Sequence, residues 1–315
     1  MKVAIFGVWH VHAVDYTKHA LAHAEVLGFY EKDDALASAF SERFDIPRFE
    51  SAEALLASDA DGVIVCSASS DHAEDMIRIA KAGKSIFTEK VLALTDEDCD
   101  RVERAVAENG VGFTISLFQK YLASRRKVKE IVDSGELGKL NYMRFRNCHS
   151  GSIANWLPTH FYNAEQCGGG AMIDLGAHGM YLTEWIMGMP VSASSTFTVC
   201  CENEAALEKN KDRVEDNAVT VMQFANGAIA VNETGFVSSY SPVTLEVHGE
   251  RGSVRMSGNH VYKRTKATEG KELELELGAD QPLPILQFLK GEVLEGCGMA
   301  EAKALTHMMT LAYGK

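Results

Sequence analysis

The sequence is poor in proline, has no excess of basic residues and contains no long apolar run, and each absence excludes a class of protein. Proline accounts for 6 of 315 residues, apolar residues for 46% and charged residues for 24%, a composition typical of a globular chain rather than a disordered or collagen-like one. Lys and Arg total 31 against 44 Asp and Glu, a net charge of −13, so we expect no nucleic-acid partner. No apolar run has the length of a membrane-spanning helix, and we expect no membrane association.

The cysteines lack the pattern of a disulfide framework. There are 7 of them, an odd number, without a C-x-x-C pair, and the adjacent Cys200 and Cys201 cannot form an ordinary bridge to each other. The chain opens on a strand-like MKVAIFG without the basic and apolar regions of a secretory signal. We therefore expect a reduced, cytoplasmic protein.

What the sequence does contain is a change of pattern near residue 118. The length suggests two domains. Before this point short apolar runs alternate with helical stretches, as in a parallel sheet; after it alternating strands dominate, and Asn226-Gly227 is a strong hairpin signal. We predict an α/β Rossmann domain with a doubly wound parallel sheet over 1–118, and an α+β domain with a large, mainly antiparallel sheet over 119–315.

The expected elements follow from these patterns. In the first domain we expect strands at 2–6, 26–30, 62–66, 85–88 and 111–116, with helices at 35–44, 71–82 and 95–108. In the second we expect a helix at 123–133, a strand at 139–147, a long helix from the glycines at 168–170 to about 187, strands at 219–224, 228–233 and 272–277, and closing helices at 285–294 and 299–313. The charged stretch 202–215 is expected to be an exposed excursion between strands.

The turn after the first strand, Gly7 to His12, lies where a dinucleotide-binding fold places its phosphate loop. Its glycine pattern is incomplete, because Trp9 stands at the second glycine position, where the backbone normally approaches a pyrophosphate, and His12 stands at the third. Glu31 ends the second strand, where a carboxylate can accept hydrogen bonds from a ribose and disfavours a 2′-phosphate. The alternative is that Glu31 and the aspartates after it only cap the next helix.

Histidines recur in this region, at His10 and His12 and again at His19 and His23. A zinc site needs three or four converging ligands, and no Cys or carboxylate is positioned by the sequence to complete either pair. We therefore expect ordinary loop or surface histidines and no metal.

Three residues are candidates for chemistry. Lys90 ends the fourth strand, at the carboxyl edge of the sheet where ligands of such folds bind. Asp174 and His178 follow the glycine-rich turn, one α-helical turn apart and so on one helix face, where they can bind hydroxyls and move protons. The alternative for Asp174 and His178 is an ordinary helix pair without chemistry.

This order of motifs resembles the Gfo/Idh/MocA family of NAD(P)-dependent oxidoreductases: a Rossmann half, Glu89-Lys90 at the end of its fourth strand, a glycine-rich helix start with Asp174 and His178, and a large antiparallel sheet. The resemblance covers essentially the whole chain. It implies an active site of Lys90, Asp174 and His178, a nicotinamide cofactor, and a sugar, inositol or related polyol as substrate. Glu31 makes NAD the expected cofactor, with NADP less favoured. Val91 replaces the proline that follows the family's lysine.

Hydride transfer from a secondary alcohol requires a base at the hydroxyl oxygen. A free lysine has a pKa of about 10.4 and a histidine one of about 6.5, so we expect His178 to take or relay the proton. Lys90 would then hold and polarise the substrate oxygen, and Asp174 would fix a neighbouring hydroxyl.

The remaining candidates surround these residues. The expected cofactor-binding residues are Gly7, Trp9, His10, Val11, Glu31, Ser67, Ala68, His72, Glu89 and Lys90. The loop before the glycine turn offers polar groups beside aromatic faces, which suit a polyhydroxylated ligand, and the expected substrate residues are His149, Trp156, His160 and Tyr162. The alternative is that this loop packs on its own domain or on a partner subunit.

Two other functions compete with the dehydrogenase. The departures at Trp9 and Val91 are also compatible with a non-catalytic NAD-binding regulatory or sensor protein of the same fold. Asp174 and His178 with His149 could instead form a metal site for hydrolysis or lyase chemistry. Since the open face of an antiparallel sheet needs covering, we expect a homodimer or homotetramer assembled through the C-terminal sheet.

Overall fold

The computed structural model describes residues 1–292 and 294–314, which form two compact units. The first unit contains Met1–Leu117 and the segment from Pro282 to Thr306; the second contains Phe118–Gln281 and the chain from His307 onward. The division near residue 118 agrees with the sequence pattern. The segment from Pro282, expected in the second domain, packs instead in the first, because Ile285, Phe288 and Leu289 complete its core.

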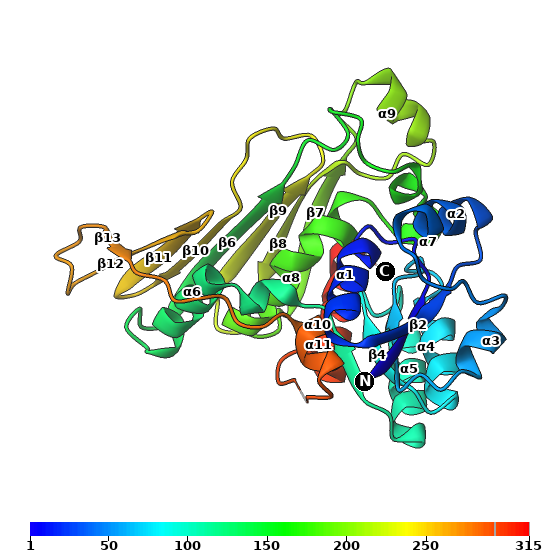
Figure 1. The fold of residues 1–315 in the computed structure, drawn as a ribbon. Helices are drawn as coiled ribbons and strands as arrows, with labels where there is room; N and C mark the ends of the chain where they lie inside the picture. Colours follow the sequence, from blue (N-terminus) through cyan, green and yellow to red (C-terminus); the bar gives the residue numbers. More distant parts are fainter. Residues whose placement is uncertain (293, 315) are drawn as a thin grey trace. The chain divides into compact units, whose positions relative to one another are not determined.

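A parallel five-stranded sheet forms the centre of the first unit (Figure 1), in the order β2-β1-β3-β4-β5. Its strands are β1 (Lys2–Phe6), β2 (Glu25–Tyr30), β3 (Gly62–Val65), β4 (Ser85–Thr88) and β5 (Phe113–Ile115). All adjacent pairs are parallel, and β3 is buried along its whole length, as a strand covered on both faces must be. The strand order reverses between β1 and β3, the kind of switch point at which ligands of open α/β sheets bind.

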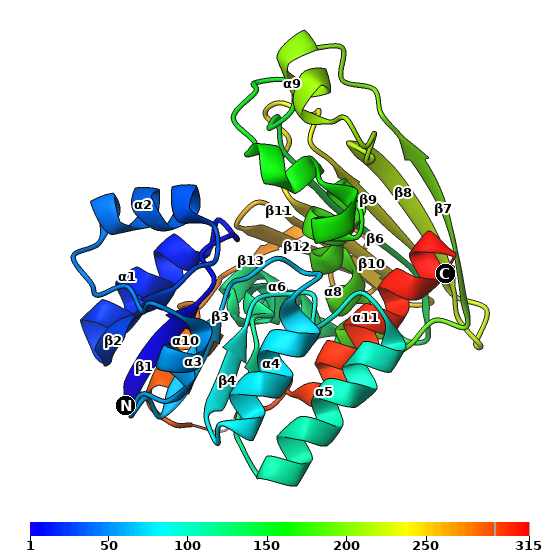
Figure 2. The ribbon, with the colours of Figure 1, turned by 90° about the vertical axis from the view of Figure 1, so that its right-hand side faces the viewer.

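Helices cover both faces of this sheet (Figure 2). They are α1 (Ala13–His23), α2 (Asp34–Arg43), α3 (Ala52–Leu56), α4 (His72–Lys81), α5 (Asp96–Asn109) and α10 (Pro284–Leu289). Helices α1, α2 and α10 share a core cluster with one face, while α4 and α5 pack together on the other. Helix α5 begins at Thr95, whose hydroxyl accepts the Asp98 N–H at 3.1 Å, and ends at Gly110 with φ 62°, where a left-handed conformation favours glycine.

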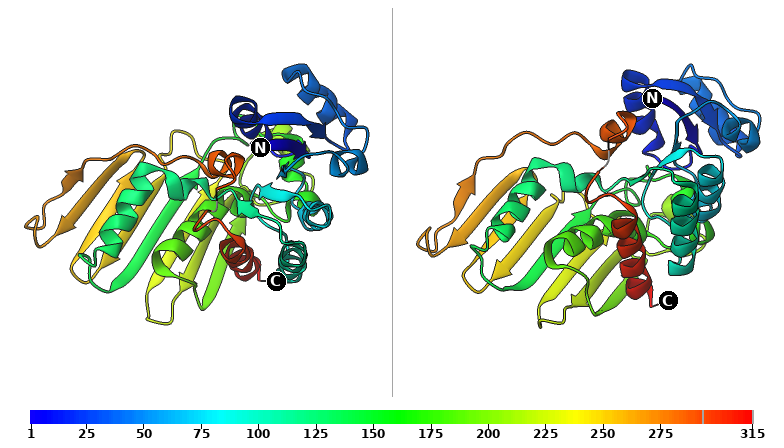
Figure 3. Two further views of the ribbon diagram at one scale, coloured as in Figure 1. Left: turned by 60° about the horizontal axis from the view of Figure 1, so that its bottom comes forward. Right: turned by 90° about the horizontal axis from the view of Figure 1, so that it is seen from below.

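The second unit is built on an eight-stranded sheet in the order β13-β12-β11-β10-β6-β9-β8-β7. Its strands are β6 (Leu140–Cys148), β7 (Ser192–Thr198), β8 (Asn217–Gln223), β9 (Ile229–Gly235), β10 (Thr244–Gly249), β11 (Gly252–Ser257), β12 (His260–Thr265) and β13 (Leu273–Leu275). Only the β6–β9 pair of this described sheet is parallel, so the predicted mainly antiparallel sheet is confirmed. Helices α6 (Ala123–Asp133) and α8 (Ala177–Met187) pack on one face of the sheet (Figure 3).

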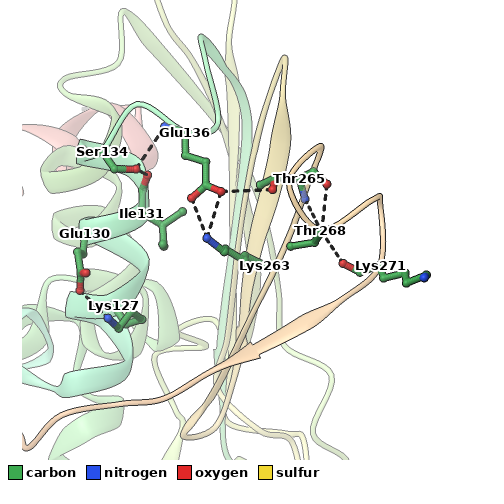
Figure 4. Close-up of polar contacts among 9 residues, drawn as sticks. All are labelled: Lys127, Glu130, Ile131, Ser134, Glu136, Lys263, Thr265, Thr268 and Lys271. Atoms are coloured by element: carbon green, nitrogen blue, oxygen red, sulfur yellow. Dashed lines mark hydrogen bonds and ion pairs between the residues drawn. The ribbon is translucent and has the colours of Figure 1, made fainter.

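A polar network fastens the turn after α6 to the far part of this sheet (Figure 4). The Glu136 carboxylate accepts from Lys263 Nζ at 3.0 and 3.1 Å and from the Thr265 hydroxyl at 3.3 Å. The Thr265 N–H donates to the Thr268 hydroxyl at 3.0 Å and closes the turn that follows β12. The Lys263–Glu136 pair is partly buried, which makes it less screened by solvent than a surface ion pair.

Several expected elements differ from the observed ones. The long helix begins with a π-helical segment, Met172–Gly176, before α8. The stretch 202–215, expected to be an exposed excursion, contains α9 (Glu204–Lys209) and ends in residues that are buried. The helix expected at 285–294 is the shorter α10, and residue 293 lies outside the described residues. The last helix is α11 (Met299–Tyr313), as predicted, and none of the described helices is long and apolar enough to cross a bilayer.

Candidate nucleotide pocket and catalytic residues

A pocket of about 260 Å³ opens in the first unit at the carboxyl ends of β1, β2 and β3. Five of the residues predicted to bind the cofactor line it: Gly7, Trp9, Glu31, Ser67 and Ala68. The other lining residues are Phe6, Tyr30, Lys32, Ser70, Asp71, Glu74, Asp75 and Arg78. The pocket therefore lies at the switch point of the sheet, where the order of the strands reverses.

Gly7 is the residue that lets the turns after β1 and β3 meet. Its φ of +79° is in the left-handed region, and a Cβ at this position would lie 2.5 Å from the backbone N and Cα of Ser67. Any side chain would therefore clash with backbone that cannot move aside cheaply. Trp9, in contrast, is one of the residues that line the pocket. The side chain at the second glycine position therefore changes the lining without closing the pocket.

Glu31 supports this turn from the end of β2. Its side chain is buried, with Oε2 accepting the Val8 N–H at 2.7 Å and Oε1 accepting the Asp33 N–H at 2.9 Å. A carboxylate oxygen has two lone pairs, so Glu31 can still accept from a ligand in the pocket that it lines. Capping of α2 belongs to Asp33, whose Oδ1 accepts the Ala35 N–H at 2.8 Å.

The charge in the pocket is predominantly acidic. Lys32 pairs with Asp71 at 2.6 Å, and Arg78 pairs with Glu53 at 2.6 Å, so both cations of the lining are neutralised locally. Burial, together with the nearby charge of Asp71, raises the pKa of the Asp75 carboxyl to about 6. The pocket consequently lacks the surplus of positive charge that an additional phosphate group would require.

Outside the lining of this pocket, two histidines of the turn after β1 meet a glutamate from the end of β4. Glu89 is 0% exposed; it accepts a hydrogen bond from the Tyr16 hydroxyl and lies 3.2 Å from His12 Nδ1. Burial raises the pKa of Glu89, but the charges of His12 and His10 and the hydrogen bond from His12 outweigh it and hold the pKa well below its usual range. The sequence could not pair these residues, because Glu89 lies far along the chain from His12.

The other predicted cofactor residues do not line the pocket. His72 is buried, with Nδ1 2.7 Å from the Val91 carbonyl and Nε2 3.1 Å from the Ser67 carbonyl. Its ring therefore holds the loop after β3 and the residue that follows Lys90, and burial lowers its pKa. Val11 is exposed. Contact of His72 and Val11 with the cofactor remains a prediction.

In the second unit, Asp174 lies in the π-helical segment and His178 in the first turn of α8. The expectation that a regular α-helical turn separates them is therefore wrong. At the start of this helix, the Glu215 carboxylate accepts the Met172 N–H at 3.0 Å and the Tyr313 hydroxyl at 2.6 Å. Such capping of the first amides fixes the local helix geometry, and π-helical turns are frequent at functional sites.

Tyr181 orients the His178 ring. The Tyr181 hydroxyl lies 2.9 Å from His178 Nδ1 and accepts the backbone N–H of Gln119 at 3.2 Å. The Phe118 ring packs edge-on against the imidazole, with centroids 5.2 Å apart. Sequence reasoning missed Tyr181, although its position three residues after His178 on one helix is a signal that could have found it.

The loop before the glycine turn carries the four predicted substrate residues, and two of them, His149 and Trp156, pack against each other. The His149 ring stacks on Phe236 at 4.9 Å and packs against Trp156 at 4.7 Å. Burial lowers the pKa of His149, and the charge of Asp174 opposes this shift. Trp156 is 55% exposed.

The other two predicted substrate residues of this loop are Tyr162 and His160. Tyr162 is buried in a cluster with Leu157 and Phe161, and its hydroxyl lies 2.6 Å from the Ser152 hydroxyl. The His160 ring packs beside Phe161, with centroids 5.2 Å apart. The structure thus gives Tyr162 a packing role, and substrate contact by Tyr162 or His160 remains a prediction.

Both parts of the chain match models of known protein families. Residues 1–117 match the model of an oxidoreductase family with an NAD-binding Rossmann fold, and residues 125–255 match the GFO/IDH/MocA C-terminal domain. These two matches cover most of the chain. The protein therefore belongs to the Gfo/Idh/MocA family of oxidoreductases, and the predicted family and fold class are confirmed.

Similar proteins include two inositol dehydrogenases. The chain is 28% identical over 198 residues to myo-inositol 2-dehydrogenase of Thermotoga maritima, a match of 62% of this chain and 56% of the relative. It is also 28% identical over 195 residues to the NAD(+)-dependent scyllo-inositol 2-dehydrogenase of Bacillus subtilis, covering 62% and 54%. The chain thus spans a little over half the length of these relatives.

A solved structure of levoglucosan dehydrogenase with NADH and levoglucosan has the same fold. Its TM-score is 0.83 at 17% identity, covering 100% of this chain and 96% of that one. The match confirms the predicted combination of a Rossmann unit and an α+β unit.

Proposed function

We propose that this protein is an NAD-dependent dehydrogenase or reductase that transfers a hydride between nicotinamide and a secondary alcohol or ketone of a sugar, an inositol or a related polyol. The observation that carries the proposal is the pocket at the β1/β3 switch point, lined by Gly7, Glu31 and Ser67, in a chain whose first domain matches an NAD-binding family. The presence of Lys90, Asp174 and His178 and the dehydrogenase names of the relatives favour catalysis over a purely regulatory role.

The chemistry of the pocket supports NAD over NADP. Glu31 offers carboxylate oxygens to ribose hydroxyls, which a 2′-phosphate would repel. Lys32 and Arg78, the two cations of the lining, are each paired with a carboxylate. The volume of about 260 Å³ suits one nucleoside half of the dinucleotide, and Gly7 and Ala68 keep the walls free of bulky side chains.

The proposed roles of the remaining residues follow from what hydride transfer requires. Bound NAD supplies the hydride acceptor or donor. His178, held by the Tyr181 hydroxyl at 2.9 Å, exchanges the proton of the substrate hydroxyl. Lys90 donates to the same substrate oxygen, and Asp174 binds a neighbouring hydroxyl.

A panel of sugars and inositols, assayed for NADH formation with NADP in parallel, tests this function. We expect turnover with at least one polyol and a strong preference for NAD. Tight NAD binding without turnover on any polyol or ketone would support the regulatory alternative. A preference for NADP would contradict the role given to Glu31.

We further propose that the protein forms a homodimer or homotetramer through its C-terminal sheet. On the face opposite to α6 and α8, Val219 and Val221 of β8 and Ile229 of β9 are exposed, and exposed apolar groups gathered on one face are typical of interfaces. Light scattering at micromolar concentration should show an oligomer, and Val221→Glu should dissociate it. A monomeric wild-type protein would contradict the proposal.

A reducing, cytoplasmic location is also proposed. All seven cysteines are free thiols, and five of them are buried. A thiol titration of the freshly purified protein under denaturing conditions should therefore find every cysteine reduced.

A further inference from the structure

We propose that His10, His12 and Glu89 bind one divalent transition-metal ion of the zinc class. The two histidines come from the turn after β1 and the glutamate from the end of β4, so the fold of the first unit alone assembles them. The proposal concerns metal binding and does not depend on the dehydrogenase activity proposed above.

The distances among the three side chains suit a metal ion. One ligand atom from each residue lies within 4.8 Å of the others, and His12 Nδ1 lies 3.2 Å from Glu89 Oε2. A tetrahedral ion with bonds of about 2.1 Å separates its ligand atoms by roughly 3.4 Å. The His12–Glu89 distance is already close to this value, and the rings of His10 and His12 are adjacent, with centroids 4.7 Å apart.

The donor set is also chemically appropriate. Two imidazoles and one carboxylate form one of the ligand sets of catalytic zinc, with a fourth position left for water or substrate. Among the described residues, Glu89 Oε1 is buried without a hydrogen-bond partner. Because a buried carboxylate oxygen without a partner is costly, it points to a cation that the carboxylate would bind.

The surroundings would hold the carboxylate in place. The Tyr16 hydroxyl donates to Glu89 Oε2 and lies 2.7 Å from the Ser116 hydroxyl. Such hydrogen bonds behind a ligand fix its orientation and strengthen metal binding. The His12 side chain is 32% exposed and provides an entry path.

Two ordinary explanations compete with a metal. His12 and Glu89 form an ion pair that needs no ion, and histidines in a phosphate-binding turn can contact a cofactor phosphate. Neither explanation predicts that the apoprotein binds a transition metal, so a titration without nucleotide separates them from the proposal.

The experiment uses full-length protein stripped with a chelator and titrated with Co²⁺, then with Zn²⁺, in the absence of nucleotide. We expect one equivalent of Co²⁺ to bind with the visible absorption of a low-symmetry site, and Zn²⁺ to displace it. His12→Gln and Glu89→Gln should each weaken binding at least ~10-fold. His23→Gln, at an exposed position of α1, is the matched control and should bind normally.

Circular dichroism and thermal unfolding of each variant report whether it folds; if Glu89→Gln does not, the partly exposed His12→Gln decides. Absence of Co²⁺ binding to the wild-type protein would overturn the proposal. So would full affinity in folded His12→Gln, or an equal loss in His23→Gln. A His12→Gln variant that weakens NAD binding while metal binding is unchanged would assign the histidine to the cofactor and also overturn it.

Discussion

Asp75 should make both folding and nucleotide binding sensitive to pH. Its side chain lies on α4 in the wall of the pocket, and burial, with the charge of Asp71, raises its pKa from 3.8 to about 6. The folded protein therefore holds this proton more strongly than the unfolded chain. The sign follows from linkage: stability falls as pH rises from about 4 to about 6, and the loss is complete above that range.

The magnitude follows from the same shift. A pKa raised from 3.8 to about 6 corresponds to about 3 kcal/mol as an upper figure, and solvent at the rim of the pocket reduces this to about 1–2 kcal/mol. Asp75→Asn keeps the shape of the side chain and removes the charge. The variant should therefore be more stable than the wild type by about 1–2 kcal/mol near pH 8, and the difference should vanish near pH 4.

Thermal and urea unfolding at both pH values measure this difference. Because the same carboxylate faces the proposed nucleotide site, Asp75→Asn should also bind NAD about fivefold more tightly near pH 8, equivalent to roughly 1 kcal/mol. Glu74→Gln removes an exposed charge of the same pocket and is the control. A stability gain that persists unchanged at acid pH, or no gain at all, would refute the role assigned to burial of Asp75.

Three further changes test the second unit. Gly179→Ala places a Cβ 2.0 Å from Asn232 Oδ1 and should cost about 1–3 kcal/mol, seen as a lower Tm; an unchanged Tm would contradict the tight helix–sheet contact. Glu215→Ala leaves the Met172 N–H and the Tyr313 hydroxyl without their acceptor and should cost about 2–4 kcal/mol in urea unfolding. Tyr181→Phe releases the His178 ring and should lower kcat about tenfold and shift the pH profile; it should also lower Tm, because the buried Gln119 N–H loses the Tyr181 hydroxyl as acceptor, and an unaltered pH profile would remove Tyr181 from the mechanism.

The division into two folds and the position of a pocket at the ends of β1 and β3 were predictable because they depend on local patterns. Buried apolar runs define β1 and β3, and Gly7 and Glu31 lie at strand ends where the parallel topology brings them together. The packing of the segment from Pro282 was not predictable, since its amphipathic helix fits either unit by sequence alone.

Contacts between residues that are far apart in the chain could not be predicted from the sequence. The Met172 N–H at the start of the π-helical segment donates to Glu215, a residue assigned by its charged neighbours to an exposed excursion. The cluster of His10 and His12 with Glu89 joins separate strand ends in the same way. Tyr162, whose polar tip suggested a substrate contact, is buried because its ring fits the core and Ser152 satisfies its hydroxyl.

The most direct test of the proposed function is a double-mutant cycle on Lys90 and His178 with NAD and a polyol substrate. Lys90→Met alone should lower kcat at least ~100-fold at saturating NAD. If both side chains act on one substrate oxygen, adding His178→Gln should reduce kcat/KM little further, because residues that act as a unit are not additive. Near-normal turnover in Lys90→Met, or losses that multiply in the double variant, would contradict the account.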